Sequence, residues 1–210
     1  MRFSRVIALF ALAALPAVAF AGKAKEPDPL PVIVATGIGE FDTVFNPAKG
    51  IQDKLKAESD SLKKARTDAN AALEVATDDP LGTALAELKK KANTKLKVVM
   101  SGRMPKVSPE GVVPDNIQKG IDAVNGLVDA ADGTITRAGG LKDEAIRLAG
   151  ACKDFPGKLP GLVKNPLEIA SKGKVVGDDV KATTALPDRI QLVVDEAGGI
   201  FTDVQGAFAE

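Results

Sequence analysis

The chain has 210 residues with 28 basic and 28 acidic side chains, a single cysteine, and no histidine, tryptophan or tyrosine. Without histidine there is no imidazole acid–base pair, no Ser–His or Cys–His nucleophile and no histidine-ligated metal or haem. One cysteine excludes an intrachain disulfide and a multi-cysteine zinc or iron–sulfur site. We therefore expect no catalytic residue, no cofactor and no metal site.

The first 21 residues have the pattern of a secretory signal peptide. Arg2 and Arg5 precede an apolar run over residues 6–20, and the triplet that ends at Ala21 fits the small-x-small cleavage rule. An uncleaved membrane anchor is the alternative, but the run is shorter than the roughly 20 apolar residues of a spanning helix. We expect cleavage after Ala21 and an exported protein, periplasmic or secreted.

Charge and cysteine usage give little reason to expect a special partner. Loss of Arg2 and Arg5 leaves two more acidic than basic residues in the rest of the chain. This near-neutral balance argues against nucleic acid as a partner. Cys152 follows Leu148 by four residues on an apolar stripe, so we expect a buried thiol rather than a reactive or intermolecular one.

Prolines divide the chain after the signal peptide. Residues 22–46 form a leader with several prolines and glycines, charged at first and apolar from Val32 onward. We expect residues 32–45 to be an extended segment that lies on the body of the protein. Residues 47–210 are expected to form a single helical-bundle domain.

Long stretches of that domain lack an interior proline and repeat apolar residues every three or four positions, which is the helical period. The predicted helices cover residues 48–77, 81–99, 115–152 and 188–210. Asn46 and Pro47 are expected to cap and begin the first helix. Gly139 and Gly140 predict a kink or break in the third helix.

The apolar stripes of these helices are narrow and rich in alanine and glycine, and strand-like alternation is nearly absent. Small residues let helices approach closely but bury little area each. The sequence therefore predicts an all-α fold, an elongated antiparallel bundle of about four main amphipathic helices with coiled-coil-like packing.

A connector over residues 155–177 contains two Pro-Gly pairs. One interpretation is a stiff turn that presents apolar side chains to a partner. The alternative is a connector that folds these side chains back onto the bundle. The candidate partner-binding residues are Phe155, Leu159, Leu162 and Val163.

Charge is unevenly distributed along the chain. Residues 80–106 contain seven basic residues and one acidic residue, whereas residues 177–210 contain seven acidic and two basic residues. The basic segment could bind an anionic lipid or polymer, or it could pack against the acidic C-terminal helix and be neutralised there. The candidate anionic-surface patch consists of Lys89, Lys90, Lys91, Lys95, Lys97 and Arg103.

Three classes of function remain. The favoured one is a non-catalytic structural or protein-interaction role in the cell envelope, through another envelope protein or through self-association. An amphipathic bundle that binds lipid or a membrane surface is the alternative, but interfacial helices generally use the tryptophan and tyrosine that this chain lacks. A carboxylate-dependent enzyme is the third class, and no pair of acidic residues stands out to support it.

Overall fold

The computed structural model describes residues 29–209, so the predicted signal peptide and most of the expected charged leader lie outside the described residues. The described chain is mostly helical, as the sequence predicts, with one small two-stranded sheet. Its elements are α1 (Gly39–Ala72), α2 (Leu81–Lys91), β1 (Leu96–Ser101), β2 (Met104–Pro109), α3 (Asp115–Gly139), α4 (Lys142–Ala151), α5 (Phe155–Leu162) and α6 (Pro166–Phe208).

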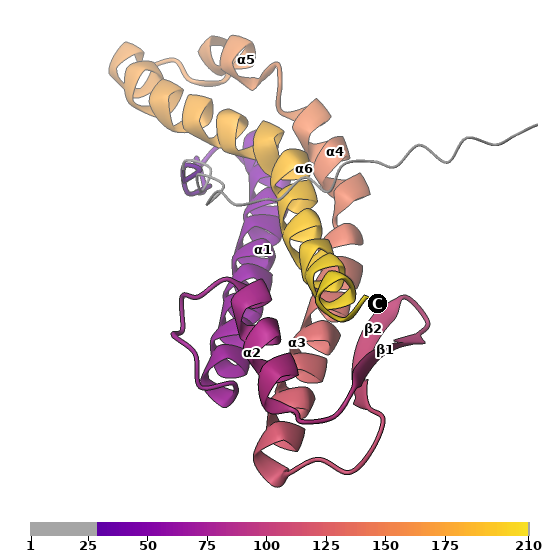
Figure 1. Cartoon of the computed structure of the whole chain (residues 1–210). Coiled ribbons are helices and arrows are strands. Elements are labelled where there is room, and N and C mark those ends of the chain that lie inside the picture. Colours follow the sequence, from indigo (N-terminus) through magenta and orange to yellow (C-terminus); the bar gives the residue numbers. More distant parts are fainter. Residues whose placement is uncertain (1–28, 210) are drawn as a thin grey trace, which may run out of the picture.

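Three long helical segments, α1, α3 with α4, and α6, form the body of the protein (Figure 1). Glu58 of α1 contacts Arg137 near the end of α3, and Lys142 at the start of α4 contacts Gln191 of α6. The chain runs down α1, up α3 and α4, and down α6, so that α1 and α6 are parallel and α3–α4 is antiparallel to both. This down-up-down order follows from connections that return the chain to the neighbouring helix.

The predicted helix over residues 81–99 is the largest error of the sequence interpretation. Helix α2 ends at Lys91, Asn93 adopts a left-handed φ of 48°, and residues 96–109 form a β-hairpin. Leu96 and Val99 fit a helical stripe, but Leu96, Val98 and Met100 also fit the two-residue period of a strand. Pro105 and Pro109 keep the second half of the hairpin from being helical.

The start of α1 also differs from the prediction. The helix begins at Gly39, includes Pro47 in its interior, and ends at Ala72 rather than at residue 77. Phe41 and Phe45 are fully buried within these additional residues, which make about two turns of helix. Burial of each phenylalanine contributes about 1.5–3 kcal/mol, which offsets the roughly 3 kcal/mol cost of an interior proline. Asn46 is therefore helical and does not cap the helix.

Two other predicted helix boundaries lie at Gly139-Gly140 and at Pro187. The break at Gly139-Gly140 is confirmed, because α3 ends at Gly139 and α4 begins two residues after Gly140. The predicted start of the last helix at residue 188 is wrong, since α6 continues from Pro166 to Phe208 with Pro187 inside it. Leu186 and Ile190 are buried on the same face of α6, and their burial stabilises the helix around Pro187.

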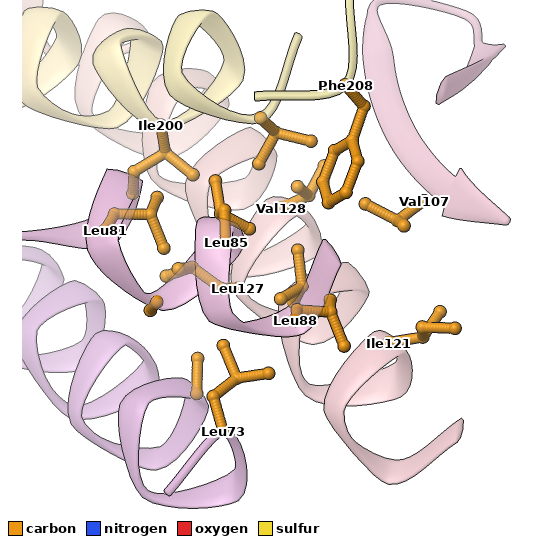
Figure 2. Close-up of a cluster of buried hydrophobic side chains, with 14 of the residues drawn as sticks. Leu73, Leu81, Leu85, Leu88, Val107, Ile121, Leu127, Val128, Ile200 and Phe208 are labelled. Atoms are coloured by element: carbon orange, nitrogen blue, oxygen red, sulfur yellow. The ribbon is translucent and has the colours of Figure 1, made fainter. Parts of the chain in front are cut away.

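Two hydrophobic cores lie along the three long segments. The leucine core fills the end near α2 and the hairpin, where Leu85 of α2 and Leu127 of α3 meet Phe208 of α6 (Figure 2). The phenylalanine core fills the other end, where Phe155 of α5 stacks on Phe41 with ring centroids 4.2 Å apart and meets Phe45 edge-on. Cys152 is buried in the phenylalanine core, and burial raises the pKa of its thiol.

Candidate functional site

A groove of about 530 Å³ opens between α1 and α6, and the extended segment over residues 29–38 closes one end of it. We call this segment the strap. Site volumes between 300 and 1,000 Å³ are typical of small-molecule and peptide-anchor pockets. The apolar lining consists of Leu30, Val32, Leu55, Leu186, Leu192 and Val193. A second recess near the end of α1 measures about 20 Å³, which holds no more than a water molecule or two.

The groove depends on the polar side chains that α1 places beside its buried stripe on the side that faces α6. Its core stripe, which includes Ile51, Leu55 and Leu62, is buried. The adjacent stripe over residues 52–63 is polar, and its members Gln52, Lys56, Ser59 and Lys63 recur every three or four positions along the groove wall. Eleven residues of helix span about 16 Å, which is the length of the groove along α1.

The rim of the groove carries both signs of charge in equal number. Its charged residues are Asp53, Lys56, Asp60, Lys63, Arg189 and Glu196. Lys56 bonds to Asp60 one turn later at 2.5 Å, and this bond lowers the pKa of the Asp60 carboxyl. A balanced rim of this kind gives the groove no net attraction for an anionic or a cationic surface.

The strap is held against the body by side chains that bond to its backbone. Gln52 of α1 accepts a hydrogen bond from the Ile33 N–H at 3.0 Å and donates one to the Pro31 carbonyl at 2.9 Å. Asp179 of α6 accepts a bond from the Val34 N–H at 3.1 Å. The expectation of an extended segment laid on the body over residues 32–45 is therefore confirmed for residues 32–38 and wrong for residues 39–45, which are helical.

Asp179 is the most unusual titratable group in the described residues. It is 1% exposed, and its Oδ2 has no hydrogen-bond partner in the protein. The pKa of Asp179 is raised to about 6, mainly by burial and also by the nearby carboxylates of Asp178 and Asp42, whereas the bond from Val34 N–H opposes the shift. A perturbed carboxyl is a catalytic candidate only where substrate can reach it. Asp179 lines neither recess, so its position fits a latch for the strap.

Most of the candidate partner-binding residues are inaccessible in this structure. Phe155, Leu159 and Val163 belong to the phenylalanine core and are 6% exposed or less. Leu162 lies at the end of α5 and is 46% exposed. The first half of the connector is therefore the short helix α5 that folds back onto the bundle, which is the alternative that the sequence left open.

The candidate anionic-surface patch is divided among several elements and acidic partners. Lys91 pairs with Glu74, and Lys90 and Lys97 lie near Glu87 and Glu110. Arg103 at the hairpin tip bonds to Asp132 and Thr136 of α3. Lys95 lies between α2 and β1 and also has an interaction partner.

The basic segment contacts the acidic C-terminal helix through a backbone group. Lys89 donates a hydrogen bond at 3.2 Å to the carbonyl of Ala207, near the end of α6. The ion pairs of the basic segment involve acidic residues of α2, of α3 and of the loops after α1 and β2. Local pairing, more than the C-terminal helix, neutralises this segment.

Sequence reasoning missed the groove because its residues do not form a motif. Its two walls come from positions more than 120 residues apart, and the polar stripe of α1 looks like an ordinary solvated face. The only sign of the groove is that the apolar residues Val32 and Leu192, which lie beside polar stripes, are 68% and 48% exposed. That signal becomes meaningful only when α1 and α6 are placed side by side.

Within residues 29–209, no group of three or more acidic or cysteine side chains is placed to hold a metal ion. No helix in that range is both long and apolar enough to cross a membrane. Comparison with known proteins finds no matching protein family, no similar curated protein and no similar solved structure. The proposal below therefore rests on the geometry of the groove.

Proposed function

We propose that this chain is an exported, non-catalytic protein of the cell envelope, an elongated helical bundle that binds an amphipathic helix of a partner protein in the α1–α6 groove. The signal-peptide pattern of residues 1–21 supports export. The single observation that supports the binding role is the groove itself, with an apolar floor and a charge-balanced rim.

A helix is the occupant that fits the groove best. The groove follows two parallel helices over about three turns, and its lining on both of them suits a third helix laid alongside. Amphipathic helices bind such grooves through apolar residues at positions i, i+3, i+4 and i+7. Acidic and basic rim residues then pair with charges that flank the apolar stripe of the bound helix.

Binding to an anionic lipid surface is the weaker candidate. An anionic bilayer over the groove would face Asp53, Asp60 and Glu196 as well as the basic rim residues. The basic segment at residues 89–103 is also largely paired with local carboxylates. Charge therefore favours a protein helix that carries both signs over a membrane of one sign.

Site-specific photo-crosslinking in the cells that express the protein tests this function. A photo-reactive amino acid at Ser59 or Leu192 places the reactive group in the groove, and the same group at Leu167 is the control. Leu167 is 82% exposed at the start of α6, far from the groove. We expect both groove positions, and not the control, to capture one amphipathic segment of the same protein.

Affinity measurements complete the test. A synthetic peptide of the captured segment should bind the purified protein, and Leu192→Asp should weaken binding at least tenfold while Leu167→Asp leaves it unchanged. Lipid adducts at the groove positions, or no adducts beyond the control, would overturn the proposal. Pelleting of the purified protein with anionic vesicles at physiological salt would favour the lipid alternative instead.

A further inference from the structure

The two edges of the β-hairpin differ in whether their outward backbone groups are free to pair with another strand. Strand β2 lies against α3, where the Asn125 side chain accepts a bond from the Val107 N–H at 2.8 Å and donates one to the Val107 carbonyl at 3.0 Å. Lys106 bonds to the Asn125 carbonyl at 2.8 Å, and Arg103 fixes the hairpin tip to Asp132. Strand β1 is the outer strand of the sheet (Figure 1).

The register shows which backbone groups of β1 point outward. Val107 directs both its N–H and its carbonyl to Asn125, so the pair Val98–Val107 is a non-hydrogen-bonded pair of the hairpin. Hydrogen-bonded and non-hydrogen-bonded residues alternate along the strand, and Lys95 lies an odd number of residues from Val98. The hydrogen bond from Glu110 N–H to the Lys95 carbonyl across the hairpin therefore agrees with this assignment. Val98 and Met100 therefore present their N–H and carbonyl groups on the outer edge of β1.

Prolines that prevent pairing are placed on β2 only, although β1 carries one charged residue, Lys97. Pro105 and Pro109 stand opposite Met100 and Leu96, at positions where β2 would otherwise present outward N–H groups. Natural sheets protect exposed edges with proline, bulges, charges or a covering element. Strand β1 has no proline and no bulge, and none of the hydrogen bonds found within residues 29–209 occupies the outward groups of Val98 or Met100.

We propose that the outer edge of β1 pairs with the same strand of a second copy, so that two hairpins form a continuous four-stranded antiparallel sheet. In an isologous arrangement about Val99, Val98 of one copy pairs with Met100 of the other, and each pair exchanges two backbone hydrogen bonds. The edge is thus complementary to itself.

Side chains favour this register and this occupant. Val99 and Met100 are 46% and 50% exposed in the single chain, and pairing brings the two Val99 side chains together on the outer face. Lys97 then lies opposite Ser101 of the second copy, so its charge does not meet a like charge. A register centred on Lys97 would place two lysines opposite each other, and it is disfavoured for that reason.

Self-association through β1 is separate from helix binding in the groove. The hairpin contacts α3 and the end of α6, whereas the groove is lined by the strap, the middle of α1 and residues 186–196 of α6. A dimer formed through β1 therefore leaves both grooves open, and each proposal can fail without the other.

Sedimentation velocity over a concentration series tests the dimer, using protein without residues 1–21, which retains every described element. We expect a reversible monomer–dimer equilibrium. Val99→Lys should raise the dissociation constant at least tenfold, because two added charges would meet at the centre of the paired strands. Val112→Lys is the matched control, since Val112 is fully exposed in the loop before α3.

Val98→Pro tests the backbone contribution. It removes an N–H that points outward and leaves the bonds between β1 and β2 in place. We expect loss of the dimer with unchanged far-ultraviolet circular dichroism. A dimer that survives both Val99→Lys and Val98→Pro, or a protein that stays monomeric across the series, would overturn the proposal.

Crosslinking gives an independent measurement. A non-hydrogen-bonded antiparallel pair places its two Cα atoms about 4.5 Å apart, which is within disulfide range. Under mild oxidation Val99→Cys should form a disulfide-linked dimer rapidly, and Val112→Cys should form it at least tenfold more slowly. Cys152 is buried and does not compete. Equal rates for the two variants would contradict pairing at Val99.

Discussion

The two hydrophobic cores of this protein differ in the polar side chains that are buried in or beside them. The leucine core is lined by aliphatic side chains and Phe208, and its buried Asn70 donates hydrogen bonds to three carbonyls of the loop after α1 while its own Oδ1 has no partner. The phenylalanine core adjoins Asp179 and Thr183, which are buried one turn apart and each leave an oxygen without a partner. The buried carboxyl of Asp179 is the group that has no counterpart among the described residues of the leucine core. The groove and the strap lie on the phenylalanine side.

Aromatic stacking should make the phenylalanine core the more sensitive of the two. Phe155→Ala removes the stack on Phe41 and the edge contact with Phe45, and we expect a loss of about 3–5 kcal/mol in the free energy of unfolding. Leu127→Ala in the leucine core should cost about 2–5 kcal/mol. Urea unfolding of both variants measures these losses.

Because α1, α3 and α6 have buried residues in both cores, each variant should unfold in a single transition. Two resolved transitions in either variant would show instead that the cores are independent folding units.

Asp179 should make stability depend on pH. Its carboxyl has a pKa of about 6 in the folded protein and about 3.9 when unfolded, so the folded state binds more protons between those values. This group therefore contributes stability below pH 4 that is lost as pH rises to about 6, up to about 3 kcal/mol.

Asp179→Asn should gain stability relative to the wild type by that amount between pH 4 and pH 7. Urea unfolding at several pH values measures the difference. Asp188→Asn, an exposed position of the same helix that does not contribute to the Asp179 shift, is the control and should change little. A constant difference between Asp179→Asn and the wild type across this range would contradict the raised pKa.

The hairpin depends on Asn125 for its attachment to α3. Asn125→Ala leaves the Val107 N–H and carbonyl without their partners, and we expect a loss of about 1–3 kcal/mol. Hydrogen exchange should increase most in residues 96–109. The control Asn116→Ala, at an exposed position of the same helix, should leave exchange in the hairpin unchanged.

The smallest effect concerns glycine within α3. A Cβ at Gly126 would meet no atom within 4 Å, so Gly126→Ala should stabilise the protein by up to about 1 kcal/mol. At Gly120 a Cβ would lie 2.8 Å from Cδ2 of Leu73, so Gly120→Ala should gain less or lose stability. Thermal unfolding compares the stability of the two variants. An equal gain in stability would show that the leucine core has room for a methyl group at Gly120.

Most helical segments and one break were predictable because their signals are local. The apolar spacing of α3, the glycine pair that ends it and the buried face of α6 each occupy one short window of sequence. The hairpin was not predictable from the same windows, because Leu96 and Val99 fit the helical period while Leu96, Val98 and Met100 fit the strand period. Its outcome depends on contacts with Asn125 and Phe208, which lie far along the chain.

By itself the sequence determined the helical class, the burial of Cys152 and the absence of histidine chemistry, because composition and local period decide each of these. Only the tertiary structure decided that α1 begins before Pro47, that Asp179 is buried beneath the strap, and that a polar stripe of α1 faces α6 across a groove. The physical reason is distance along the chain. Burial of Phe41 and of Asp179 depends on residues more than 100 positions away, and no local pattern encodes that contact.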